Sequence, residues 1–241
     1  MSDLSAFPIT KRWPAQHPDR LQLYSLPTPN GVKVSIMLEE IGLPYEVHLV
    51  DFNKDDQKTL EFLSLNPNGK IPAILDPNGP GGKPLPLFES GAILQYLAEK
   101  TGELLPADAA RRYETLQWVH FQMGGIGPMF GQVGFFHKFA GKEFSDKRPL
   151  ERYVAESKRL LGVMETRLTA RQWVMDDDTR SPIFRCSVGS VTWSASTARA
   201  ISSRSIRSRT CRRGWSAVWR GRQCSEGWIF RSGHRCVNMD T

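Results

Sequence analysis

Residues 68–93, NGKIPAILDPNGPGGKPLPLFESGAI, decide the fold of this 241-residue chain. The apolar run at residues 71–75 is rich in strand formers and too short for a helix. Glycines and prolines then fill residues 76–82, as in a turn. A second strand is expected at residues 85–88, and Ser90 is placed as the N-cap of the next helix. The stretch therefore predicts a strand, a hairpin turn, a second strand and a capped helix.

Two features of this stretch indicate a peptide-binding site. Pro72 cannot donate to a ladder, so Ile71 is expected at a strand edge, and a cis bond before Pro72 would let the Ile71 backbone pair with an extended peptide. Glu89 and Ser90 place a carboxylate and a hydroxyl at a helix N-terminus, where backbone N–H groups favour an anion. A small peptide with an ammonium and a carboxylate at one end would find both partners there. The alternative is an edge-strand proline and an ordinary capping serine.

The preceding residues extend this unit to β-α-β-α-β-β-α, which ends near residue 101. Residues 1–20 show no apolar period and are expected to lie on the surface as an extension. The elements expected before residue 68 are a strand at 21–26, a helix opened by 28–31 and closed by Gly42, a strand at 45–51, a polar loop at 53–57 and a short helix at 59–65.

A helical region is expected after a linker at residues 102–110. A helix at residues 111–123 meets glycines and a proline at 124–128, which must kink or break it. Residues 151–171 predict a long amphipathic helix. We assign residues 111–178 to a partial helical domain.

These motifs together resemble the cytosolic glutathione transferases. The segments GKIPAI and LFESGAI follow LYSLPTPNGVKVSIMLEE in the order and spacing of that family. The resemblance is to the bacterial group akin to the yeast nitrogen regulator, whose first helix opens with TPNG, and it covers roughly residues 21–174. It implies a thioredoxin-like domain at residues 21–101 followed by an all-helical domain.

The resemblance also implies where glutathione binds. Glu89 and Ser90 would hold the amine and carboxylate of the γ-glutamyl end. Ile71 would offer its backbone to the cysteinyl unit, with Pro72 fixing the shape of the chain.

Three further residues match family positions around the tripeptide. Gln57 and Lys70 lie near those for its carboxylate end. Arg152 resembles an arginine that reaches the site, from the other subunit in a homodimer, and a solvated helix charge is the equal alternative. No metal is expected.

Thiol activation must come from groups other than an enzyme cysteine, because the first cysteine is Cys186. Tyr24 lies within the first strand, a position that this group of the family does not use. Thr28 and Asn30 lie at a helix N-terminus, where partial positive charge and side-chain donors lower a thiol pKa. We expect both to stabilise the glutathione sulfur, and simple capping is the alternative.

The last 63 residues differ in composition from the rest. Residues 1–178 hold 20 Lys and Arg against 23 Asp and Glu, whereas residues 179–241 hold twelve Arg, twelve Ser, four Trp, all four Cys and no Leu. The cysteine spacing fits no zinc pattern. An Arg-rich tail that binds nucleic acid is one interpretation.

A shifted reading frame explains residues 179–241 better. With one base added, every Cys or Trp codon overlies a Leu, Met or Val codon, and every TCN serine codon overlies an apolar one. We therefore expect the helical domain to be incomplete after residue 178, with no native-like core in residues 179–241.

The predicted function is that of a cytoplasmic glutathione-dependent enzyme. Glutathione thiolate would attack a small electrophile or reduce a disulfide. A non-catalytic regulatory or binding protein and an inactive frameshifted remnant are the alternatives. We expect no membrane span, and nucleic acid is the less favoured partner.

Overall fold

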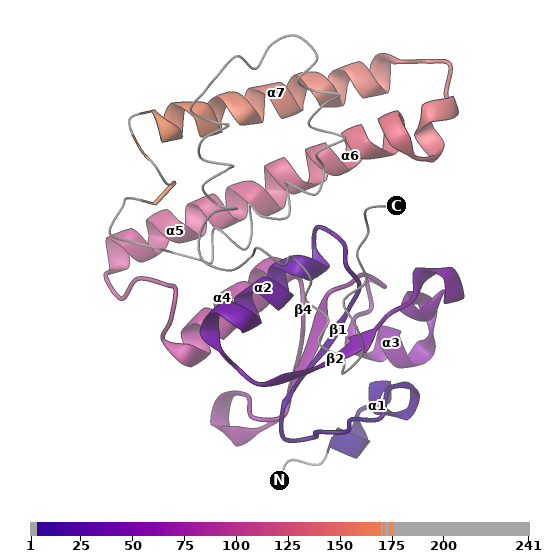
Figure 1. Cartoon of the computed structure of the whole chain (residues 1–241), viewed down its shortest axis with the longest axis vertical. Coiled ribbons are helices and arrows are strands. Elements are labelled where there is room, and N and C mark those ends of the chain that lie inside the picture. Colours follow the sequence, from indigo (N-terminus) through magenta and orange to yellow (C-terminus); the bar gives the residue numbers. More distant parts are fainter. Residues whose placement is uncertain (1–3, 170, 172–173, 176–241) are drawn as a thin grey trace. The chain divides into compact units, whose positions relative to one another are not determined.

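A computed structural model of the chain describes residues 4–169, 171 and 174–175. They divide into two compact units, one ending at Glu103 and the other beginning at Leu104 (Figure 1). Our expectations for residues 179–241 lie outside the described residues.

The first unit is built on a mixed sheet. Its described strands are β1 (Leu21–Ser25), β2 (Tyr45–Leu49), β3 (Ala73–Asp76) and β4 (Leu85–Phe88). They lie in the order β2-β1-β3-β4, with β1 and β2 parallel and the other pairs antiparallel. Helices α2 (Gly31–Ile41), α3 (Leu60–Leu65) and α4 (Ser90–Thr101) alternate with them in the chain. The predicted β-α-β-α-β-β-α order and the thioredoxin-like fold class are therefore confirmed.

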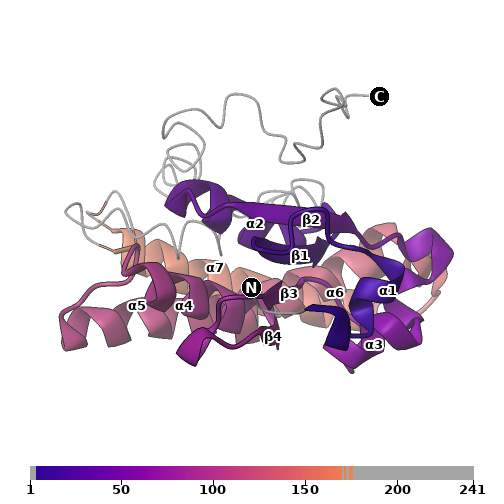
Figure 2. The same ribbon diagram turned by 90° about the horizontal axis from the view of Figure 1, so that it is seen from below.

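Side chains of both sheet faces are buried. Tyr24, Ala73 and Leu75 pack with Phe62 of α3 on one face. Neighbouring strand residues point the opposite way, so the fully buried Leu23 and Ile74 line the other face. Figures 1 and 2 show α2 and α4 along that second face, and α3 beside α1 (Ile9–Arg12) on the first.

The N-terminal segment contributes two side chains to the core, although residues 16–20 are exposed as expected of a surface extension. Leu4 and Ile9 are 5% and 0% exposed and belong to the cluster formed by α3 and the sheet. The expectation was wrong for Leu4 and Ile9 because two apolar side chains, five residues apart, show no helical or strand period and yet become buried when the segment folds back onto the sheet.

The second unit is helical. It contains α5 (Ala109–Phe121), a π-helical turn (Gln122–Ile126), α6 (Gly127–Lys138) and α7 (Arg148–Leu168). The π-turn is the predicted interruption at the glycines and Pro128. An added Cβ at Gly125 would lie 3.2 Å from a Leu160 methyl group, so the glycine lets α7 pack closely against the turn. The buried core of this unit comprises Ile126, Phe130, Val133, Leu160, Leu161, Met164, Leu168 and Val174.

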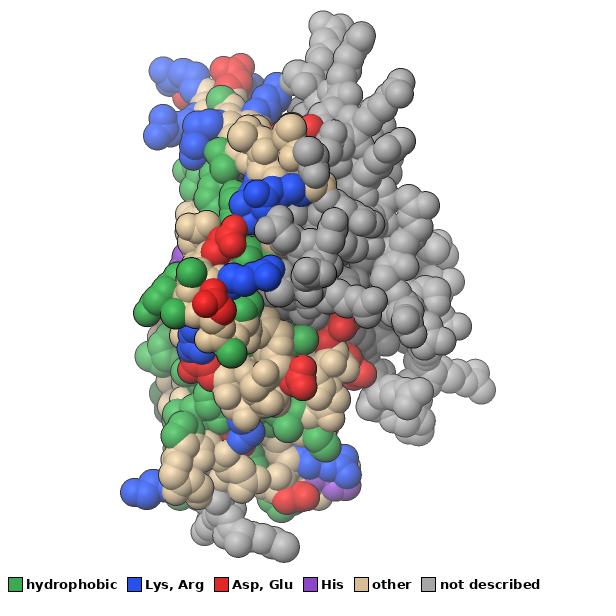
Figure 3. Space-filling model, turned by 90° about the vertical axis from the view of Figure 1, so that its left-hand side faces the viewer, with side chains coloured by type: hydrophobic (Ala, Val, Ile, Leu, Met, Phe, Trp, Pro, Cys, Tyr) green, Lys and Arg blue, Asp and Glu red, His purple; other side chains and the backbone are tan. Residues whose placement is uncertain are grey.

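The described surface carries side chains of both charges. On the face seen in Figure 3, Lys and Arg side chains lie among Asp and Glu side chains. None of the described helices is both long enough and apolar enough to cross a bilayer.

Candidate functional site

Three predicted segments of the first unit meet at one end of the sheet because of the strand register. Tyr24 of β1 pairs with Ala73, and Ala73 pairs with Phe88 of β4. The residues that follow Tyr24 and Phe88 and those that precede Ala73 therefore emerge side by side. This places the Thr28–Asn30 turn, Ile71–Pro72 and Glu89–Ser90 around one point.

The turn before α2 is shaped by Gly31. An added Cβ there would lie 2.1 Å from the Leu26 carbonyl oxygen and 2.5 Å from Ser25 Oγ, so only glycine allows the helix to begin directly against β1. Thr28 Oγ1 accepts a hydrogen bond of 3.2 Å from the Gly31 N–H. The Thr28 hydroxyl thus accepts a bond at the helix N-terminus and keeps its hydrogen to donate, so its expected role at the glutathione sulfur stays a prediction.

Asn30 has a different environment. Its side chain caps no N–H group of α2 and its backbone is already helical (φ −82°, ψ −39°). Instead, Asn30 Oδ1 accepts a hydrogen bond of 2.9 Å from Lys33 Nζ. The capping alternative for Asn30 therefore does not describe its side chain.

Lys33 connects this turn to α4. Its side chain is buried, and Nζ also donates a hydrogen bond of 3.3 Å to Ser90 Oγ. Burial lowers the pKa of Lys33 to about 8, although the negative charge of Glu89 opposes the shift. The helix N-termini that carry Asn30 and Ser90 are joined through this ammonium group.

The N-terminus of α4 is displaced by one residue from the prediction. Glu89 occupies the N-cap position, Ser90 is the first helical residue, and Glu89 makes no side-chain capping bond. The Ser90 hydroxyl meets Lys33 instead, which explains why the N-cap assignment was wrong. Glu89 has a positive φ (φ 71°, ψ 112°), which is strained for a residue with a Cβ, and it is exposed.

The bond between Ile71 and Pro72 is cis, the conformation considered from the sequence. β3 begins only at Ala73, two residues later than expected, because the chain turns before it enters the sheet. Ile71 therefore lies outside the ladder at the edge of the site.

Gln57 and Lys70 lie on neighbouring segments. An added Cβ at Gly69, which precedes Lys70, would lie 3.2 Å from the Gln57 carbonyl oxygen. Lys70 is exposed, and its carbonyl accepts a hydrogen bond of 2.6 Å from Asn66 Nδ2. Among the described residues, Gln57 Oε1 is buried and accepts no hydrogen bond.

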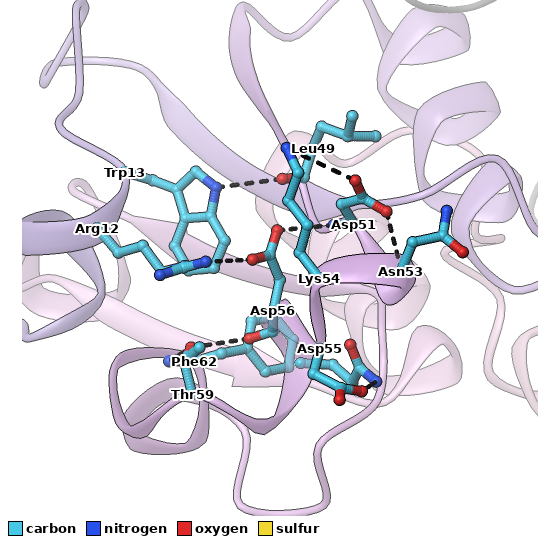
Figure 4. A network of polar contacts seen from close by, with 11 residues as sticks. Arg12, Trp13, Leu49, Asp51, Asn53, Lys54, Asp55, Asp56, Thr59 and Phe62 are labelled. Carbon is cyan, nitrogen blue, oxygen red and sulfur yellow. Dashed lines mark hydrogen bonds and ion pairs between the residues drawn. The ribbon is translucent and has the colours of Figure 1, made fainter.

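The loop that carries Gln57 is held by the buried Asp56 (Figure 4). Asp56 forms an ion pair with Arg12 of the N-terminal segment and accepts a hydrogen bond of 2.9 Å from the Asp51 N–H. Burial alone would raise the pKa of Asp56, but the bonds from Arg12 and Asp51 and the Arg12 charge hold it below its usual value. Trp13 Nε1 donates a 3.1 Å hydrogen bond to the Leu49 carbonyl, which also holds the N-terminal segment in place.

Arg152 belongs to the second unit. It lies exposed on α7, where its charge helps lower the pKa of Glu156, after the larger effect of the Arg159 hydrogen bond. Within the described residues this is the environment of a solvated helix charge.

Tyr24 is unsuited to thiol activation. Its side chain is fully buried and stacks on His48 with ring centroids 4.7 Å apart. Its hydroxyl is buried without a hydrogen-bond partner in the described part of the chain, and burial raises its pKa. The prediction that Thr28 and Asn30 at the α2 N-terminus stabilise the glutathione sulfur stays a prediction.

Comparison with known proteins identifies the family. Residues 19–99 match the glutathione S-transferase N-terminal domain. The chain is 47% identical over 155 residues to the Escherichia coli disulfide-bond oxidoreductase YfcG, an alignment that covers 64% of this chain and 71% of that protein. The chain belongs to the glutathione transferase family.

Further relatives of this glutathione transferase agree. The Escherichia coli disulfide-bond oxidoreductase YghU is 41% identical over 169 residues, which are 68% of this chain and 57% of that protein. A crystal structure of a Pseudomonas putida glutathione transferase, with one glutathione disulfide bound per subunit, superimposes with a TM-score of 0.72 at 61% identity. The superposition covers 88% of this chain and 98% of that one.

Our interpretation of the transferase sequence missed two residues, and the sequence held a signal for one of them, Lys33. Lys33 lies three residues after Asn30 and four before the buried Met37, so it shares an inward face of α2. Asp56 was assigned to a polar loop, and nothing local indicated Arg12 as its partner. No three His, Cys, Asp or Glu side chains of the described residues are grouped so that they could hold a metal.

Proposed function

We propose that this transferase reduces disulfides with glutathione, and that the reacting sulfur belongs to glutathione. The observation that carries the proposal is the environment of Asn30. Its amide stands at the N-terminus of α2 beside a buried ammonium, and no cysteine precedes Cys186 in the chain. A bound thiol at this point would meet donors and partial positive charge, which favour the thiolate.

The residues around Asn30 fit the ends of the tripeptide. Glu89 supplies a carboxylate for the γ-glutamyl ammonium. Ser90 and the N-terminus of α4 supply donors for the adjacent carboxylate. Ile71 offers backbone groups to the cysteinyl unit, and Gln57 and Lys70 are proposed for the glycyl end.

Disulfide reduction then needs two glutathione molecules. The first thiolate attacks one sulfur of the substrate disulfide, forms a mixed disulfide and releases one substrate thiolate. A second glutathione thiolate attacks the glutathione sulfur of that mixed disulfide, releases the second substrate thiolate and forms glutathione disulfide. The bound glutathione disulfide of the Pseudomonas putida relative and the name of YfcG support this sequence of steps.

Reduction of hydroxyethyl disulfide by glutathione tests the proposal. Glutathione disulfide would be recycled by glutathione reductase, and the consumption of NADPH gives the rate. We expect the full chain to accelerate the reaction above the uncatalysed rate, with Asn30→Ala as the inactive comparison. A rate equal to the blank, with heat on titration of glutathione, would favour the regulatory or binding function.

A chlorinated aromatic substrate separates the two transfer reactions. Attack of the thiolate on the ring carbon, with loss of chloride, needs one glutathione. The rate should therefore rise hyperbolically with glutathione concentration, as for the binding of one molecule. We propose disulfide reduction as the faster reaction.

The oligomeric state, the cellular location and the shifted reading frame stay predictions. Light scattering would test the homodimer, and cell fractionation would test the cytoplasmic location. Sequencing of the gene around the codon for Asp178 would test the shifted frame. Absence of both glutathione binding and turnover would favour an inactive remnant.

A further inference from the structure

The side chain of Lys33 is enclosed between the two helix N-termini of the candidate site. Lys33 is the third residue of α2, and it is 1% exposed. Its ammonium group donates to Asn30 Oδ1 at 2.9 Å and to Ser90 Oγ at 3.3 Å. A lysine head normally reaches solvent, so its burial against these two oxygens needs an explanation.

The bond to Asn30 fixes the orientation of its amide. An ammonium group has donors and no acceptor, so it can face only the carbonyl oxygen of the amide. The Nδ2 group, with two N–H donors, must then point away from Lys33. It is available to an anion outside the α2 N-terminus, where the glutathione sulfur is proposed to lie.

The same argument applies to Ser90. Its oxygen accepts from Lys33, so its hydroxyl hydrogen is directed away from the ammonium group. A hydroxyl held this way at the start of α4 can donate to a carboxylate. One cation thus orients a donor on each of two helices.

The charge of Lys33 also acts on both anions. Coulomb attraction is stronger in a partly buried site than in water, so a thiolate and a carboxylate near this ammonium are both stabilised. Burial works against this charge, and a costly buried charge is more readily retained for function than for stability.

We infer that Lys33 is a positioning residue that directs the Asn30 amide to the glutathione thiolate and the Ser90 hydroxyl to the γ-glutamyl carboxylate. The inference rests on the proposed glutathione-dependent function. It assigns two roles to one side chain, which can be separated experimentally.

The test compares the full chain with Lys33→Met, which keeps an unbranched side chain and removes the charge and the donors. Lys83→Met, an exposed lysine in the turn before β4, is the control for the same change in net charge. The readouts are the pKa of bound glutathione, from the ultraviolet absorbance of its thiolate, and kcat and KM with hydroxyethyl disulfide. Titration of S-methylglutathione, which forms no thiolate, measures the effect on the γ-glutamyl carboxylate, through the Lys33 charge and the Ser90 hydroxyl, separately from the effect on the thiolate.

We expect Lys33→Met to raise the pKa of the bound thiol by about one unit and to lower kcat about 10- to 100-fold. Affinity for S-methylglutathione should fall about 3- to 10-fold, and the melting temperature should stay within a few degrees of the parent or rise. Lys83→Met should leave all four unchanged. Lys33→Gln keeps a donor without the charge, so its thiol pKa and kcat should lie between those of the parent and those of Lys33→Met. It replaces Lys33→Met in the test if that variant does not fold.

A bound-thiol pKa and a kcat within twofold of the parent would overturn the inference. A large fall in melting temperature with an unchanged thiol pKa would also overturn it, because it would show that Lys33 is structural. Failure of the parent chain to bind glutathione would refute the proposed function instead.

Discussion

Two buried charges of the first unit, Asp56 and Lys33, have opposite environments. Asp56 has an ion-pair partner in Arg12 and one backbone donor, the Asp51 N–H, and these hold its pKa below the usual range. Lys33 donates hydrogen bonds to Asn30 Oδ1 and Ser90 Oγ, and burial lowers its pKa to about 8. The surroundings favour the charged form of Asp56 and disfavour that of Lys33. The comparison indicates that Asp56 stabilises the fold, whereas the charge of Lys33 costs stability, as expected of a residue kept for the proposed glutathione site.

Substitution of Asp56 should give the largest loss of stability. Asp56→Ala leaves the Asp51 N–H and Arg12 without their acceptor and should lower the unfolding free energy by about 3 kcal/mol at pH 7. Urea unfolding measures it. The deficit should shrink at acid pH, because a carboxyl whose folded pKa is depressed contributes stability above its unfolded pKa and loses it as pH falls through the folded value.

A matched control uses a surface pair on the same loop. Lys58 and Asp55 are 2.9 Å apart with side chains 69% and 63% exposed. Lys58→Ala should change the unfolding free energy by no more than about 0.5 kcal/mol. Equal effects of Asp56→Ala and Lys58→Ala would contradict a structural role for Asp56.

Substitutions around Lys33 should change the activity rather than the stability. Asn30→Ala removes the amide that Lys33 orients, so kcat for hydroxyethyl disulfide should fall about 100-fold, with a much smaller rise in the KM for glutathione. Steady-state kinetics with varied glutathione checks this. A raised KM with unchanged kcat would mean that Asn30 only binds glutathione.

The pH dependence of stability separates the two charges further. The pKa of Lys33 is about 8 in the folded chain, against an ordinary value of 10.5. Between these two pH values, Lys33 binds more protons in the unfolded chain than in the folded one. The unfolding free energy therefore gains roughly 2 kcal/mol from Lys33 across this window as pH rises. Lys33→Met should lose this gain. Unfolding curves of parent and variant that run parallel from pH 7 to 10.5 would refute a depressed pKa.

The smallest effect concerns the carboxylate that acts on Lys33. Glu89 has a φ of 71°, which glycine adopts at little cost. Glu89→Gly should be more stable than Glu89→Ala by about 1 kcal/mol in thermal unfolding, although both lack the carboxylate. Equal stability of the two variants would show that the backbone of Glu89 carries no strain.

The fold was predictable where local rules agree with the final structure. The second strand of the hairpin was placed at residues 85–88, where β4 lies, and the helix after it ends at Thr101 as expected. α7 begins and ends three residues earlier than the predicted 151–171, because Pro149 starts the helix before its apolar period is evident. The burial of Leu4 and Ile9 depends on a surface formed by distant residues, and no local pattern predicted it.

The sequence alone determined the elements, the absence of a cysteine before Cys186, and the residue types of the TPNG, KIPAI and FESGAI motifs, since these follow from periodicity, turn chemistry and composition. Only the tertiary structure decided which polar groups meet. The strand register brings Asn30 and Ser90 to one end of the sheet, and burial selects Lys33 as the group between them. Such contacts join residues up to 57 positions apart, and their energies depend on desolvation, which no local window of sequence contains.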